Sequence, residues 1–203
     1  MKKNIVLMFT LIALLAGCSS MPLSKQQVNK VQSIAIINNF PQYPSYSSIG
    51  TTVFQNSYDK IINKNYQEEL SSIFAKYLGQ KGYKNVAVYN KTKKYKGEVD
   101  LVITLEPSGL NRPAAPNNAG YGIYQRSFFG IQDKASTYIE MNALVKLKSG
   151  EEFNTHFHDF APVSFKDLPK KWDYLSNSQK NEIESKIKQN MKKSINAMRD
   201  LGL

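Results

Sequence analysis

The chain has 203 residues, with 27 Lys and Arg against 16 Asp and Glu, and a formal charge of +11. This length is sufficient for one domain with a buried core. The chain contains one cysteine and two histidines. These counts exclude an intramolecular disulfide framework, a zinc site built on several cysteines and a site with three histidine ligands.

The first 17 residues have the organisation of a secretory signal. Lys2 and Lys3 precede an apolar run from Ile5 to Ala16, which is too short to span a bilayer because a spanning helix needs about 20 residues. The run ends in Leu15-Ala16-Gly17-Cys18. This segment resembles the lipobox of bacterial lipoproteins, which implies lipidation of Cys18 and cleavage just before it. The alternative is an ordinary signal peptide with an incidental cysteine.

The lipoprotein resemblance implies a place outside the cytoplasm. Two or three acyl chains would anchor the protein stably, so the lipid bilayer becomes a partner through acylated Cys18. In Gram-negative lipoproteins an Asp after the cysteine favours inner-membrane retention. Ser19 stands there instead, which implies the periplasmic face of the outer membrane, or the outer face of the cell membrane in another host.

Cleavage would divide the chain into a signal peptide at 1–17 and a mature protein of 186 residues. Its charge would be +9, because the leader holds two lysines and no acidic residue. We expect residues 18–30 to form the acylated cysteine and a tether. Residues 31–203 are expected to form a single α+β domain.

Hydrophobic periodicity predicts the elements of this domain. An i, i+3, i+4 apolar stripe predicts a helix over 66–78, ended by glycines. Ser176 and Gln179 resemble a capping box before a last helix of about 25 residues. The other expected elements, in chain order, are a strand at 31–40, a loop at 41–48, a weak strand at 49–56, strands at 86–89 and 99–105, a long loop at 107–134, and two strands around a turn at 149–151.

The turn at 149–151 is predicted to be a three-residue hairpin loop. It would pair Leu147 with Phe153 and Ala143 with Phe157, so that apolar partners share one face. Two sequential strand groups and separate helices predict one mostly antiparallel sheet of about five to six strands, with two helices on one face. This element order resembles small α/β envelope lipoproteins of bacteria and the N-terminal domain of TolB, without a diagnostic motif.

The expected long loop carries the candidate partner-binding residues. Aromatic and Arg side chains on an exposed segment are typical of interface hot spots. The candidates are Arg112, Tyr121, Tyr124, Arg126, Phe128 and Phe129. Alternatively, these rings fold back over a sheet edge or sheet face.

No catalytic or metal site is expected. His156 and His158 share one face of a strand, but the predicted register places Asn142 and Leu144 opposite them and turns Asp159 away, so we expect solvated histidines rather than metal ligands. A G-x-S-x-G nucleophile motif is missing from the sequence. Gly120-Tyr121-Gly122 lacks the strand and helix that a nucleotide site requires. No cofactor is therefore expected.

Basic residues cluster at three places: Lys91, Lys93, Lys94 and Lys96; Lys166, Lys170 and Lys171; and Lys186, Lys188, Lys192 and Lys193. An export signal makes nucleic acid an unsuitable partner, so this charge either binds anionic lipid or glycan or only keeps the surface soluble. Trp172 is expected to pack between its loop and the last helix.

Together these features favour a non-enzymatic envelope lipoprotein that binds an envelope protein or another envelope component. The alternative hypothesis is a hydrolase or metal-dependent enzyme that acts on envelope material.

Overall fold

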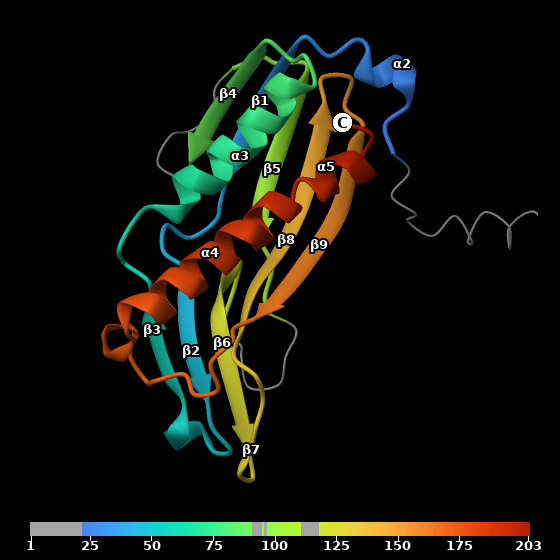
Figure 1. The fold of residues 1–203 in the computed structure, drawn as a ribbon. Helices are drawn as coiled ribbons and strands as arrows, with labels where there is room; N and C mark the ends of the chain where they lie inside the picture. The colour runs from blue at the N-terminus through green and yellow to red at the C-terminus, as the bar shows by residue number, and fades with distance from the viewer. Residues whose placement is uncertain (1–21, 91–94, 96, 111–117) are drawn as a thin grey trace, which may run out of the picture.

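The structure, a computed structural model, describes residues 22–90, 95, 97–110 and 118–203. Cys18 and the expected signal peptide lie outside this part. The described residues form an α+β fold in which one mixed sheet carries its main helices on one face (Figure 1). No helix within the described ranges is long and apolar enough to cross a membrane.

The strands belong to a single nine-stranded sheet within the described residues. They are β1 Ser33–Asn38, β2 Ser45–Ile49, β3 Ser57–Lys60, β4 Asn85–Asn90, β5 Leu101–Pro107, β6 Tyr121–Phe128, β7 Ile131–Gln132, β8 Ser136–Leu147 and β9 Glu152–Pro162. The helices are α2 Lys25–Val28, α3 Tyr66–Gln80, α4 Asn177–Lys193 and α5 Asn196–Asp200. Two short 3₁₀ turns are η1 Val53–Gln55 and η2 Trp172–Tyr174.

Strand β8 organises the sheet. One edge of β8 pairs with β9, while the other edge pairs first with β6 and then with β5. The units β6–β2–β3 and β5–β1–β4 therefore lie end to end along β8, which gives the molecule its elongated shape (Figure 1). Because β1–β4, β1–β5 and β2–β6 are parallel, the expected mostly antiparallel sheet of five to six strands is only roughly matched.

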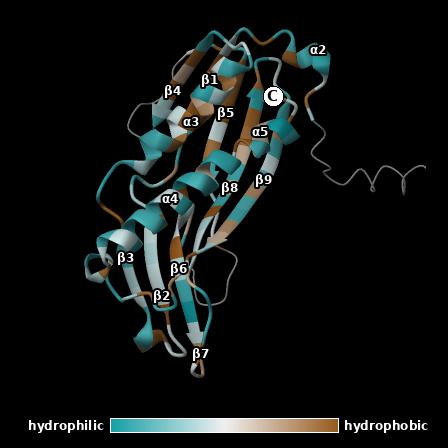
Figure 2. Ribbon diagram, viewed as in Figure 1, coloured by the Kyte–Doolittle hydropathy of each residue, from teal (hydrophilic) through white to brown (hydrophobic). Residues whose placement is uncertain are grey.

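The main core lies between this sheet and the helices. Helix α3 covers β1 and β4, and α4 covers β6, β8 and β9. Apolar residues on the strands lie beneath helices whose outer faces are hydrophilic (Figure 2). The predicted capping box of Ser176 and Gln179 is present. The expected last helix is interrupted at buried Ser194, whose hydroxyl donates to the Met191 carbonyl over 2.7 Å and so competes with the helical hydrogen bond.

Two expected loops contain strands instead. Residues 45–48 of the expected loop 41–48 form β2 together with Ile49, and the rest of the expected strand at 49–56 is mostly a bend and η1. The expected loop at 107–134 contains β6 and β7. Strand β2 is mostly serine, and Gly122, Gln125 and Arg126 interrupt the apolar residues of β6. The two strands pair with each other although they are remote in sequence, so local apolar alternation does not reveal them.

The β8–β9 hairpin differs from the prediction by two residues in register. Val145 lies opposite Phe153, and Met141 lies opposite Phe157. The Leu147 N–H donates to the Glu151 carbonyl over 2.9 Å, and Gly150 has a φ of +101°. The three-residue connection thus begins one residue earlier than expected. A shift of two residues preserves the face of every side chain but changes its cross-strand neighbour.

The fold begins before the expected boundary at residue 31. Leu23 is buried, and its N–H donates to the Leu201 carbonyl over 3.0 Å. Ser24 and Gln27 form a capping box at α2, and Gln27 Nε2 donates to Glu151 over 3.0 Å. Residues 23–30 therefore pack on the domain through specific contacts and are not a free tether.

Candidate functional site

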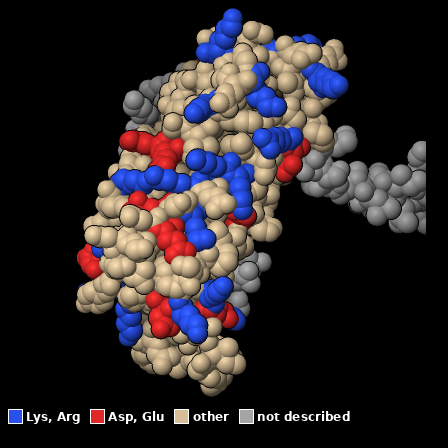
Figure 3. Space-filling model, viewed as in Figure 1, with Lys and Arg blue, Asp and Glu red and all other residues tan. Residues whose placement is uncertain are grey.

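An apolar surface lies at the end of the molecule where η1, the end of β6 and β7 meet (Figure 1). Phe54 is 95% exposed, Phe129 77% and Ile131 73%; Val53 and Phe128 are also exposed. We call these five residues the apolar tip. The lower end of the space-filling view shows no Lys, Arg, Asp or Glu on its visible face (Figure 3). Exposed apolar residues gathered in one place are typical of an interaction site.

The turn at the apolar tip is strained. Phe128 pairs with Ile131, so Phe129 and Gly130 form a two-residue hairpin loop. Both loop residues have positive φ, +47° for Phe129 and +79° for Gly130, as in a type I′ turn, whose first position favours Asn or Gly. A bulky residue in this conformation costs about 1–3 kcal/mol, and such strain is commonly found at functional sites.

The expected partner-binding residues are divided between the apolar tip and the interior. Phe128 and Phe129 are exposed at the tip. Tyr121 is buried against Phe40, and its hydroxyl donates to the Pro41 carbonyl. Burial raises the pKa of Tyr121 above its ordinary value, so its phenol remains neutral. Tyr121 therefore belongs to the core and is not accessible to a partner.

The other expected residues contribute little free surface. Tyr124 packs on Tyr138 and Phe160, on the sheet face opposite the helices. Arg126 pairs with Asp133 over 3.1 Å. Arg112 lies outside the described residues. Val53, Phe54 and Ile131 were missed by sequence reasoning. Val53 and Phe54 fell within the expected strand at 49–56, and Ile131 is a single apolar residue between Gly130 and Gln132.

The basic residues of α4 are mostly paired with acids. Lys186 lies 4.0 Å from Glu182, Lys188 lies 3.7 Å from Glu69, and Lys193 lies 2.9 Å from Asp159. Figure 3 accordingly shows Lys and Arg interleaved with Asp and Glu across this face. The cluster from Lys91 to Lys96 falls outside the described residues. The α4 surface therefore presents mixed charge rather than a continuous basic patch.

Trp172 packs as expected. Its ring is buried, makes an edge contact with Tyr46 at 6.0 Å between ring centroids, and lies 5.8 Å from Lys180 Nζ of α4. Trp172 thus joins the loop before α4 to the sheet and to the helix.

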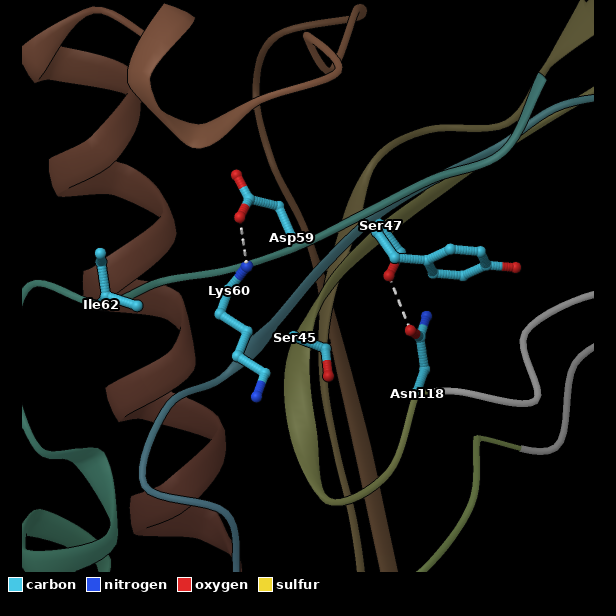
Figure 4. Close-up of a pocket in the computed structure, with 7 residues that line it drawn as sticks. Ser45, Ser47, Asp59, Lys60, Ile62 and Asn118 are labelled. Atoms are coloured by element: carbon cyan, nitrogen blue, oxygen red, sulfur yellow. Dashed lines mark hydrogen bonds between the residues drawn. The ribbon is translucent and has the colours of Figure 1, made fainter. Parts of the chain in front are cut away.

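A hollow of about 460 Å³ lies beside β2 and β3 (Figure 4). Its lining residues are Ser45, Ser47, Tyr58, Asp59, Lys60, Ile62 and Asn118. The Ser47 hydroxyl donates to Asn118 Oδ1 over 2.6 Å, and Asp59 accepts from the Lys60 N–H over 2.8 Å. A nucleophilic serine needs a basic partner, whereas the Ser47 hydroxyl is engaged by an amide. These two contacts therefore do not activate a nucleophile.

The two histidines lie on the sheet face opposite the helices, but their neighbours differ from the expected pair. The observed register places His156 opposite Asn142 and His158 opposite Glu140. Leu144 lies opposite Asn154 instead. Asp159 points to the other face and pairs with Lys193. A buried carboxylate therefore joins the histidines, which the predicted register did not provide.

Comparison with known proteins identifies the fold alone. No protein-family model matches the chain, and no curated protein matches it. Among solved structures, the fold is similar to that of protein XCC0632 from Xanthomonas campestris, described as DUF330. The TM-score is 0.50 at 10% identity, over 90% of this chain and 86% of that one. At this identity the similarity concerns architecture, not activity.

Proposed function

We propose that this protein is a lipid-anchored envelope lipoprotein without enzymatic activity, which binds a protein partner through the apolar tip. The exposed ring of Phe129 on a strained turn carries the proposal, together with its exposed neighbour Phe54. Aromatic residues that are already exposed and rigidly held lose little entropy on binding, and aromatic anchors dominate interface energies.

The position of the anchor supports this assignment. Cys18 precedes Leu23 by five residues, a span of at most about 18 Å in a fully extended chain. Leu23 and α2 pack near the β8–β9 turn, at the end of the sheet opposite the tip (Figure 1). A lipid on Cys18 would therefore hold this end near the bilayer and direct the tip away from it.

The length of the sheet sets how far the tip would reach. Strand β8 has 12 residues, and β6 continues four residues beyond Tyr124, which pairs with Ser136. At about 3.3 Å per residue, the path from the anchored end to the tip is roughly 50 Å along the strands. The tip would therefore meet partners well beyond the lipid headgroups, on the periplasmic side of an outer membrane.

The charges at the anchored end fit the same orientation. Lys81 and Lys84 line one hollow beside α2, and Lys30 lines another. Cations beside anionic lipid headgroups contribute favourable electrostatic energy, about 1 kcal/mol each near the surface. The apolar tip offers no such charge, so the partner there would present an apolar surface.

Copurification from detergent-solubilised envelopes tests the proposal. The variant Phe54→Ser weakens the tip, and the matched control Leu144→Ser removes an exposed apolar side chain from β8, far from it. We expect a defined partner to copurify with the wild type and the control but not with Phe54→Ser. Equal recovery with all three proteins would contradict the role of the tip. Cys18→Ser should release the protein from membranes, and unchanged membrane partition would contradict the lipid anchor.

A further inference from the structure

We infer that Glu140, His156 and His158 form a binding site for a divalent transition-metal ion such as Zn²⁺. Among the described residues these three side chains each offer a ligand atom, and no two of these atoms are more than 4.8 Å apart. Two imidazoles and one carboxylate make a common donor set for zinc, whereas Mg²⁺ and Ca²⁺ prefer oxygen ligands alone.

Strand geometry brings the three ligands together. His156 and His158 are two residues apart on β9, so both point to the sheet face that the helices leave free, with ring centroids 5.8 Å apart. Glu140 lies on β8 directly opposite His158. Both strands lie within the sheet, and their pairing holds the ligand backbones at fixed separations.

A neighbouring amide fixes the orientation of His156. Its Nδ1 lies 2.9 Å from Asn142 Oδ1. Because an amide oxygen can only accept a hydrogen bond, Nδ1 carries the proton and donates it. Metal-binding histidines typically have their second nitrogen held by such a partner. Nε2 is then the nitrogen that can coordinate a metal.

The contact between His156 and Glu140 calls for a positive charge. His156 Nε2 lies 3.2 Å from Glu140 Oε2, and the Glu140 side chain is only 7% exposed. A lone pair on Nε2 and a carboxylate oxygen repel each other at this distance unless a proton or a cation lies between them. A zinc ion would take the place of the proton between these two atoms. Its positive charge would then compensate the charge of the Glu140 carboxylate, which is largely removed from water.

The fit requires movement at one ligand. Tetrahedral zinc with bonds of about 2.0–2.1 Å places its ligand atoms about 3.4 Å apart. The separation of His156 and Glu140 already meets this requirement. His158 is exposed, so rotation of its ring can bring the third ligand into place. Three protein ligands leave a fourth position for water, which is typical of an exchangeable site rather than a closed structural one.

Competition with a chromophoric zinc chelator tests the site, using the full acylated chain in detergent micelles and Zn²⁺ alone. We expect one Zn²⁺ per chain, and a loss of affinity of at least tenfold in His158→Gln and in Glu140→Gln. Asn142→Ala should weaken binding about tenfold by releasing His156. Glu152→Gln, a control on the same strand that removes the Lys146 partner, should bind as the wild type does.

A second measurement separates metal binding from loss of fold. Zn²⁺ should raise the melting temperature of the wild type and of Glu152→Gln but not that of His158→Gln. X-ray absorption should show two imidazole nitrogens among the ligands. Absence of saturable binding, or binding that survives His158→Gln unchanged, would overturn the site and leave a simple histidine–carboxylate ion pair.

Discussion

The backbone N–H of Phe129 donates to the hydroxyl of Thr51 over 2.9 Å. This bond joins the β6–β7 turn to the segment that leads into η1, although the two residues are 78 positions apart. It holds the exposed rings of Phe129 and Phe54 on neighbouring segments, so the apolar tip is one surface rather than two separate loops.

Replacement of Phe129 should change the stability of the fold and the binding of the partner in opposite directions. Asn tolerates positive φ and is favoured at this turn position, so Phe129→Asn should relieve part of the strain and raise the free energy of unfolding by about 1 kcal/mol, while it weakens partner binding. Urea denaturation and copurification measure the two effects. A destabilised variant would show that the Phe129 ring supports the fold.

Gly122 allows β2 and β6 to approach closely. A Cβ at this position would lie 2.1 Å from the Ser45 carbonyl oxygen, a backbone atom that cannot move without shifting β2. We expect Gly122→Ala to destabilise the domain by about 1–3 kcal/mol. Chemical denaturation measures the loss. Gly109→Ala, where a Cβ meets nothing within 4 Å, is the control, and equal stabilities of the two variants would contradict this explanation.

The amino-terminal segment should contribute to stability. Leu23 is buried and hydrogen-bonded to Leu201, so Leu23→Ala should cost about 2–3 kcal/mol through lost burial and a residual cavity. The exposed residue Lys25 provides a control in Lys25→Ala. Thermal unfolding of the full chain measures both. If Leu23→Ala were as stable as the wild type, the segment before residue 31 would contribute nothing to the fold, as expected of the simple tether that the sequence predicted.

Asp100 should make stability depend on pH at acid values. Its Oδ2 accepts from the N–H groups of Gln32 and Ser33 and from the Ser33 hydroxyl, each over 2.9 Å. The Gln32 bond is the main cause that lowers the carboxyl pKa. A lowered pKa means that this stabilisation is present above the ordinary Asp value and disappears as pH falls through the lower folded-state value.

Asp100→Asn tests this dependence. The variant should be less stable than the wild type at about pH 7, and the difference should shrink as the pH falls below the ordinary Asp pKa and the Asp100 carboxylate becomes protonated. Urea denaturation across this range measures it. A difference independent of pH would show that the charge of Asp100 does not contribute.

The sequence predicts elements that depend on local periodicity. The stripe of α3, the capping box of Ser176 and the alternation of β8 were all confirmed. Strand β6 was missed because distant segments cover its small and polar residues. Gly122 is buried by β2, and Gln125 is buried by the loop before α4.

The candidate sites depended on tertiary contacts in the same way. A shift of two residues in the β8–β9 register determines whether His158 lies opposite Asn142 or Glu140, and Gly150 at positive φ sets that register. For the apolar tip, Phe128 and Phe129 were identified from composition, whereas Phe54 lies on a remote segment that the Thr51 contact joins to their turn.

Site-specific photocrosslinking in intact cells tests the apolar tip most directly. A photoreactive residue would replace Phe54, and Val88, an exposed residue on edge strand β4 away from the tip, would provide the control. We predict one discrete crosslinked protein from position 54 and none of the same mass from position 88. No protein crosslink at position 54, or the same products from both positions, would contradict a docking role for the tip.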